Sequence, residues 1–265
     1  MSRLLSYFGA VVVALVPAAS AAGAEPSRAL RVGMDPRAAP WSYVPGLESA
    51  LVDFGKRPRL SAAELLRVEG LEVDVTRALA RQLGQELELV PSAWQQNENA
   101  LLRGDFDILL DAWTPRPSTP DGIVASEPYW DWGLVFVVRS GEARFARPTD
   151  LAEARLGYSP DPATERALRA MGIDRLAPHN SSAALFEALA AGSVDAAIDD
   201  STYARWRIAH DPAFRIVGEP LNRLGYHIGL RRDDAALLQR VNAAIRELRG
   251  SGELDRIRLK WLGKP

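Results

Sequence analysis

The sequence of 265 residues contains no cysteine, so no disulfide bond supports the fold, and this absence leaves the redox compartment open. Its three histidines, His179, His210 and His227, are scattered, which argues against a zinc or copper site. The formal net charge of −2 and the pI near 6.0 argue against nucleic acid, which requires a basic face. We therefore expect no metal, no cofactor and no nucleic-acid partner.

Long hydrophobic runs are missing as well, except at the N-terminus. There, Arg3 precedes an apolar run from Leu4 to Val16, and small residues follow up to Ala22-Gly23-Ala24. This pattern is typical of a secretory signal peptide with an A-x-A cleavage site. An uncleaved membrane anchor is the alternative, because the run is almost long enough to span a bilayer. We expect residues 1–24 to be removed and the mature protein to be exported.

The rest of the chain has the composition of a globular protein, with 47% hydrophobic and 25% charged residues. Its hydrophobic patterns alternate between strand and helix, which favours an α/β fold with parallel strands. Residues 44–69 look like an insertion that contains a short helix after the capping box at Ser61 and Glu64. We expect strands at 29–34, 87–90, 106–110, 134–139, 155–158, 195–198, 214–217 and 225–230, and helices at 72–83, 99–103, 163–171, 182–191, 203–209, 234–249 and 252–261.

The stretch from Trp94 to Trp132 contains four of the seven tryptophans and a polar loop, Asp111 to Pro115, directly after an expected strand. In an open α/β sheet, ligands bind beyond the carboxyl ends of the strands. We therefore predict that this loop, Trp94 and the aromatic cluster 129–132 form the wall of a cleft. A packed aromatic core is the alternative for any single ring.

Short motifs follow one another in a fixed order from residue 30 to residue 262. They are Leu30-Arg-Val-Gly-Met-Asp35, Ala39-Pro-Trp-Ser-Tyr43, Gly70-Leu-Glu-Val-Asp74, Trp94, Gly104-Asp-Phe-Asp107, Ser126-Glu-Pro-Tyr129, Asp150-Leu151, Val194-Asp-Ala-Ala-Ile198, Asp199-Asp200 and Gly252-Glu-Leu254 through Lys260-Trp261. This ordered set resembles the amino-acid-type (family 3) extracellular solute-binding proteins of ABC transporters, which have the type II periplasmic binding protein fold.

The resemblance implies two α/β lobes that are joined by two hinge strands and close over a small molecule. Lobe one would comprise residues 25–137 and 229–265, and lobe two residues 138–228, with crossings near 137–139 and 226–229. The protein would be a periplasmic monomer that binds its ligand without chemistry and delivers it to an ABC permease in the inner membrane.

The resemblance also assigns roles to individual side chains of the cleft. Trp94 matches a ring that stacks on the ligand, and Asp111, Ala112 and Thr114 match groups that line the cleft. Asp200 matches a carboxylate that binds the ammonium group of the ligand. A helix N-cap or an ion pair between the lobes is the alternative role for Asp111 and Asp200.

Two further tryptophans are candidates for the same site. Trp41 follows the first strand, with core packing as its alternative. Trp113 belongs to a stretch, Gly104 to Pro115, that is similar to betaine- and choline-binding proteins, which surround a quaternary ammonium with tryptophans. We assign Trp206 and Trp261 to packing.

Departures from the family pattern indicate a cationic ligand. The arginine that binds the ligand's α-carboxylate in the family is replaced by Thr119, although Arg116 could take over its role. The family's Gly-Thr at the start of a helix in lobe two is Asp161-Pro162 here, and proline has no N–H to donate. Both changes weaken anion binding.

We therefore expect a solute-binding protein for a small polar, amine-bearing metabolite, an amino acid or a related compound. A lyase of the cyclohexadienyl dehydratase type on the same scaffold is one alternative, because two carboxylates can perform acid/base chemistry. An accessory or sensory protein of a quinoprotein dehydrogenase, docking through residues 44–69, is another.

Overall fold

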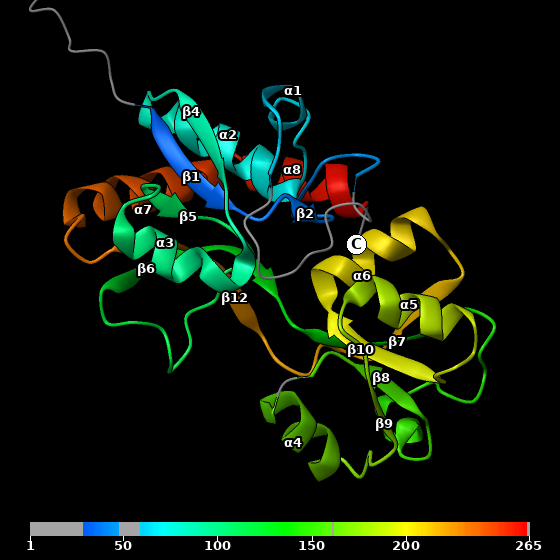
Figure 1. Cartoon of the computed structure of the whole chain (residues 1–265). Coiled ribbons are helices and arrows are strands. Elements are labelled where there is room, and N and C mark those ends of the chain that lie inside the picture. Colours follow the sequence, from blue (N-terminus) through cyan, green and yellow to red (C-terminus); the bar gives the residue numbers. More distant parts are fainter. Residues whose placement is uncertain (1–28, 48–58, 161, 264–265) are drawn as a thin grey trace, which may run out of the picture.

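The computed structural model describes residues 29–47, 59–160 and 162–263 of the chain. The expected signal peptide, residues 48–58 of the expected insertion and Asp161 lie outside these residues. The described chain forms two α/β lobes, each built on a five-stranded sheet (Figure 1). This architecture confirms the expected two-lobe fold class. No helix in the described ranges is long and apolar enough to cross a membrane.

Lobe one contains the sheet with strand order β4-β1-β5-β12-β6. Strand β1 runs parallel to β4 and β5, whereas β12 is antiparallel to β5 and β6. Its strands are β1 (Leu30–Met34), β4 (Leu87–Pro91), β5 (Ile108–Leu109), β6 (Ile123–Trp132) and β12 (Leu224–Arg231), and the small β2 (Arg37–Ala38) and β3 (Ser42–Tyr43) form a separate pair. Its helices are α1 (Ala62–Leu65), α2 (Leu71–Leu83), α3 (Asn97–Arg103), α7 (Ala235–Gly250) and α8 (Glu253–Leu262), with a 3₁₀ turn η1 (Trp94–Gln96).

Lobe two contains the sheet with strand order β11-β7-β10-β8-β9. Strands β10, β8 and β9 are parallel, and β7 is antiparallel to β10 and β11. Its strands are β7 (Leu134–Arg139), β8 (Leu156–Tyr158), β9 (Leu176–Pro178), β10 (Ala196–Asp200) and β11 (Phe214–Val217). Its helices are α4 (Pro162–Ala170), α5 (Ser182–Ala190) and α6 (Ser201–His210), with a 3₁₀ turn η2 (Pro148–Leu151).

The chain passes between the lobes at Gly133 and again in the segment 218–223, which joins β11 to β12. The crossings expected near 137–139 and 226–229 lie inside β7 and β12, so those positions are wrong. The two crossing segments touch, because a Cβ on Gly133 would lie 2.2 Å from the carbonyl oxygen of Asn222. Only glycine permits this approach, and it marks the point at which the sheets separate.

Most helices and strands follow the local patterns of the sequence. Helix α2 ends at Gly84, which adopts the left-handed conformation with φ 66°, as its C-terminal position predicts. The capping box of Ser61 and Glu64 is present in α1. Strand β6 is not among the expected strands; it contains Pro128, which is tolerated because β6 lies at the edge of its sheet.

Candidate functional site

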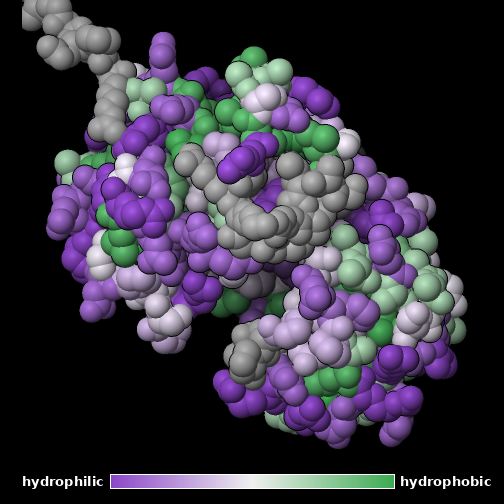
Figure 2. Space-filling view, in the orientation of Figure 1, coloured by the Kyte–Doolittle hydropathy of each residue, from purple (hydrophilic) through white to green (hydrophobic). Residues whose placement is uncertain are grey.

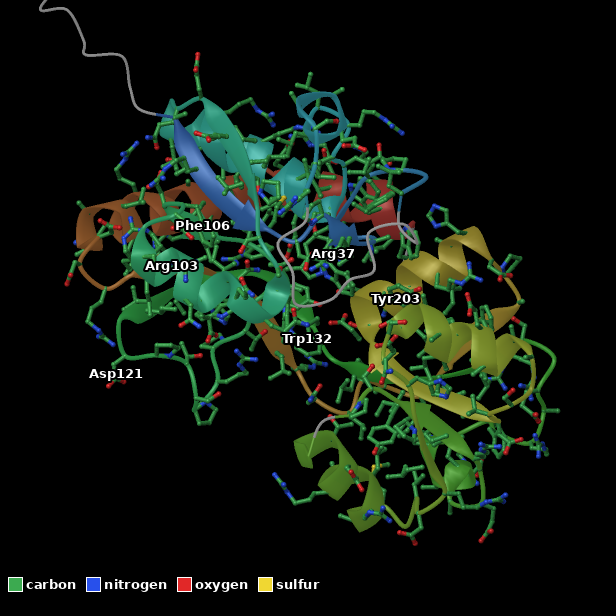
Figure 3. All side chains as sticks on the ribbon, in the orientation of Figure 1. Arg37, Arg103, Phe106, Asp121, Trp132 and Tyr203 are labelled. Carbon is green, nitrogen blue, oxygen red and sulfur yellow. The ribbon has the colours of Figure 1, made fainter. Side chains whose placement is uncertain are left out.

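The carboxyl ends of parallel strands in both sheets meet at the junction of the lobes, where open α/β sheets bind ligands. In lobe one these ends lead to Asp35, Trp94 and Asp111, and in lobe two to Ser159, His179 and Asp200. Figure 3 shows Arg37 and Tyr203 on the edges that face each other, with Trp132 where the chain leaves lobe one. The face in Figure 2 is mostly hydrophilic, and a notch separates the lobes.

The wall of lobe one is held by a network around Asp35, which is 4% exposed. Its carboxylate accepts a 2.6 Å hydrogen bond from Nε of Arg37 and a 3.0 Å bond from the backbone N–H of Trp94. Its own N–H donates to Oδ1 of Asp111 at 3.3 Å. The loops after β1, β4 and β5 are thereby tied together.

Glu72, in the first turn of α2, is fully buried below the loop that follows β5. Its Oε1 accepts hydrogen bonds from the N–H of Ala112, at 2.7 Å, and from the hydroxyl of Tyr129. Its Oε2 has no partner among the described residues. Burial is the main reason that the pKa of Glu72 rises to about 7, and the charge of Asp200 raises it further.

Ala112 has φ 47°, the left-handed conformation that residues other than glycine rarely adopt. Such strained residues cluster at functional sites, where the surrounding structure holds them in place. Here the hydrogen bond from Ala112 to Glu72 supplies that support. Glu72 of α2 thus stabilises the conformation of the loop after β5, which the sequence predicts to be part of a cleft wall.

Asp111 is 3% exposed, so it lies beneath the surface of the wall on which it was expected. Its Oδ2 accepts a 2.5 Å hydrogen bond from the side-chain amide of Asn97. Burial, followed by the charges of Asp35 and Glu72, raises the pKa of Asp111 well above its usual value. The charge of Asp200 raises the pKa of Glu72, a residue that sequence reasoning missed because an acidic residue in the first turn of an amphipathic helix usually faces solvent.

Asp200 is the N-cap of α6, which was its structural alternative. Its Oδ1 accepts a 2.6 Å bond from the N–H of Thr202, and its Oδ2 accepts the hydroxyl of Tyr226. Because Tyr226 lies on β12, this contact links lobe two to lobe one. Burial is the main reason that the pKa of Asp200 rises to about 6.

The tryptophans of the central stretch fall into two groups. Trp94 is 49% exposed, and the guanidinium of Arg116 lies 5.6 Å from its ring centroid. Arg116 also donates a 2.8 Å bond to Glu98. Trp113 is 5% exposed, packs with Phe106 and donates from Nε1 to Glu98 at 2.9 Å, so it is part of the core and not of the exposed cleft wall.

The remaining candidates lie at contacts between segments. Trp41 of lobe one stacks on Tyr203 of lobe two with a centroid distance of 6.1 Å and an interplanar angle of 24°. The hydroxyl of Thr114 donates to the carbonyl of Gly225 at 3.0 Å and accepts Nε1 of Trp132 at 3.3 Å. Thr114 therefore fixes β12 and the end of β6 to the loop after β5.

A cavity of about 480 Å³ lies beside the hinge on the side of α4. Asp199, at 6% exposure, is the acidic residue among the described residues that line it. Its Oδ1 accepts bonds from Ser182 Oγ, at 3.1 Å, and from the N–H of Asp200, at 2.8 Å, and its Oδ2 has no partner among the described residues. Burial raises the pKa of Asp199 to about 7. The other lining residues are Trp132, Leu134, Ser159, Thr164, Ala167, Ile198, Leu221, Asn222 and Leu224.

Sequence reasoning missed Asp199 because the family role belongs to the next residue, Asp200. The doubled aspartate at the end of an expected strand is the signal that could have found it.

Three comparisons with known proteins agree with this architecture. The L-cystine-binding protein TcyJ of Escherichia coli K12 is 26% identical over 201 residues, which cover 74% of this chain and 75% of TcyJ. An ancestral cationic amino acid solute-binding protein superposes with a TM-score of 0.72 at 24% identity, covering 88% of this chain and 95% of the other. The unliganded, open L-cystine solute receptor of Neisseria gonorrhoeae superposes with a TM-score of 0.70 at 22% identity, covering 89% and 93%.

The family model of the bacterial extracellular solute-binding proteins, family 3, matches residues 57–264. This range includes α2, both hinge crossings and all of lobe two. The chain therefore belongs to the family 3 bacterial extracellular solute-binding proteins.

Proposed function

We propose that this protein binds a small amine-bearing metabolite, an amino acid or a related compound, between its lobes and delivers it to an ABC permease in the inner membrane. The carrying observation is that four buried carboxyl groups at the junction, Glu72, Asp111, Asp199 and Asp200, all have raised pKa values. Burial favours the neutral forms of these groups, and a bound ammonium would stabilise their charged forms.

Arg116 and Trp94 would form the second half of the site. The guanidinium already lies over the indole ring, so the carboxylate of an amino acid could bind Arg116 while its body contacts Trp94. Arg116 would then exchange or share its contact with Glu98. Asp200 would bind the α-ammonium group, in competition with the hydroxyl of Tyr226.

A ligand screen on the mature protein tests this proposal. Amino acids, amines and betaines are added singly, and a ligand that binds the folded state raises the melting temperature by mass action. For an amine found this way, Asp200→Asn should abolish binding and Trp94→Ala should weaken it, whereas the exposed Glu88→Gln should leave it unchanged. If the tightest ligand is an anion without an amine, bound by Arg116, the proposal that the buried carboxyl groups select an ammonium is wrong.

Transport and location need separate tests. The exported protein should begin at Glu25 after cleavage behind Ala24, and an intact Met1 on membrane-bound material would contradict this. The loaded protein should stimulate ATP hydrolysis by an ABC permease reconstituted in liposomes. Stimulation of a quinoprotein dehydrogenase instead would support the accessory role.

Acid/base catalysis on the same scaffold is a second candidate, because Asp199, whose carboxyl pKa burial raises to about 7, is one of the residues around a cavity. Prolonged incubation of each ligand with the protein, followed by mass spectrometry, distinguishes the two functions. An unchanged ligand supports binding alone, and a product that disappears with Asp199→Asn supports a lyase.

A further inference from the structure

We propose that the cavity of about 480 Å³ beside the hinge receives the apolar side chain of an amino acid whose ammonium group binds Asp200. This inference rests on the proposed function and names the ligand class that the protein selects, amino acids with an apolar side chain longer than that of alanine. The volume lies within the range of small-molecule pockets, about 300–1,000 Å³.

Apolar side chains from several segments meet at this cavity. Leu134 of β7 and Ile198 of β10 belong to the core cluster that faces α4. Leu224 of β12 is the cross-strand partner of Trp132 of β6, so these two side chains are neighbours. The N–H of Leu221 donates to the carbonyl oxygen of Leu134 at 2.8 Å. The lining therefore combines lobe two with both segments of the hinge.

Part of this apolar lining is open to solvent. Leu221 is 36% exposed and Leu224 is 38% exposed, and Trp132 and Leu134 are only partly buried. A single exposed leucine is ordinary on a protein surface, but apolar side chains that gather around one cavity mark a binding surface. An apolar group of a ligand would remove them from water.

The lining offers no counter-charge to a charged side chain of a ligand. The described residues around the cavity include no lysine or arginine, and Asp199 is the acidic one. Its side chain turns to the other face of the sheet, because Asp199 is opposite Val135 and its Oδ1 accepts a hydrogen bond from Ser182 of α5. Helices α4 and α5 cover opposite faces of this sheet (Figure 1). The remaining polar side chains are neutral: Ser159, Thr164 and Asn222.

The cavity is continuous with the proposed ammonium site. Side chains alternate along a strand, so Asp200 and Ile198 lie on the same face of β10. Leu134 is directly opposite Asp200 on β7 and is its neighbour on that face. Trp132 stacks on Tyr226 with a centroid distance of 5.3 Å, and the hydroxyl of Tyr226 donates to Asp200. An ammonium group at Asp200 therefore places the rest of the ligand beside the cavity.

Calorimetry with L-alanine, L-norvaline and L-norleucine tests the proposal, because these amino acids differ only in the number of side-chain methylene groups. Each methylene group that leaves water should raise the affinity about fourfold. L-norleucine should therefore bind the mature protein at least about tenfold more tightly than L-alanine. L-lysine carries an ammonium group at the end of the same carbon chain and should bind more weakly than L-norleucine.

Two pairs of variants locate this gain. Leu221→Asp places a carboxylate at the exposed edge of the cavity and should reverse the order of L-lysine and L-norleucine, whereas Leu259→Asp, at a 47% exposed leucine of α8, should preserve it. Ala167→Trp should fill the cavity and abolish the advantage of L-norleucine over L-alanine. Ala170→Trp, at an exposed position of α4 outside the lining, should retain that advantage. Unchanged melting without ligand shows that a variant is folded.

The outcomes separate the inference from the proposed function. Equal affinities along the series in the unmodified protein would overturn the inference without any variant, as would a chain-length advantage that survives in folded Ala167→Trp. Amino acid binding would stand in both cases. If the series does not bind but the ligand screen finds another amine, the inference is wrong and the proposed function stands. If no amine binds in either experiment, both are wrong.

Discussion

Replacing Glu72 by glutamine should change how the stability of the protein depends on pH. The folded state raises the pKa of this buried carboxyl from 4.5 to about 7 and therefore favours its neutral form. Below pH 4.5 the group is protonated in both states and has no pH-dependent effect. Between pH 4.5 and 7 the unfolded chain ionises first, so the folded state loses stability as the pH rises, and above pH 7 the loss is constant.

The size of the loss follows from the shift. One pKa unit corresponds to 1.36 kcal/mol, so a shift from 4.5 to about 7 destabilises the ionised folded protein by about 3 kcal/mol. Glu72→Gln removes this loss because glutamine does not ionise. Its amide also places a buried donor where Oε2 has no partner, at a cost of about 1–3 kcal/mol that is independent of pH.

Urea denaturation at pH 4, 5, 6, 7 and 8 measures the difference in unfolding free energy between the variant and the unmodified protein. The expected signature is a change of about 3 kcal/mol in this difference between pH 4 and pH 8, in favour of glutamine at high pH. The exposed Glu88→Gln should give parallel curves. Parallel curves for Glu72→Gln would show that Glu72 is hydrated in the folded protein, and the argument from its burial would fail.

Two further outcomes are expected. In thermal melts, Gly70→Ala should destabilise the protein by more than about 3 kcal/mol, because a Cβ there would lie 2.1 Å from the carbonyl oxygen of Trp41. Gly84→Ala has open space around it and should cost only about 1 kcal/mol, from the left-handed conformation of its backbone. If the lobes close about the crossings at Gly133 and 218–223, small-angle scattering should show a smaller radius of gyration with saturating ligand. An unchanged radius would contradict hinge closure, unless the free protein already populates the closed state.

The sequence predicted those helices and strands that depend only on residues close together in the chain. Helix α2 follows from the spacing of Val75, Leu79 and Leu83, and it ends at Gly84 because glycine enters the left-handed region without a steric cost. The bounds of β7 and β11 agree with the expected strands, because each is a short run of apolar and β-branched residues. The order of such elements, with the motifs, was sufficient for the two-lobe fold.

Contacts between segments distant in the chain decided the rest. No strand was expected over β6, which contains Pro128, and the position of β6 at the edge of its sheet allows this proline. The crossings also depend on sheet membership, which pairing with distant strands sets, and the positions that the resemblance implied lie inside β7 and β12.

The chemistry of the site depends on burial, which residue type alone does not determine. Trp94 and Trp113 have the same side chain, but one is half exposed and the other packs into the core of lobe one. Glu72 and Asp199 are ordinary acidic residues in the sequence. The fold removes water from their carboxyl groups, and this desolvation raises their pKa values and leaves one oxygen of each without a partner among the described residues.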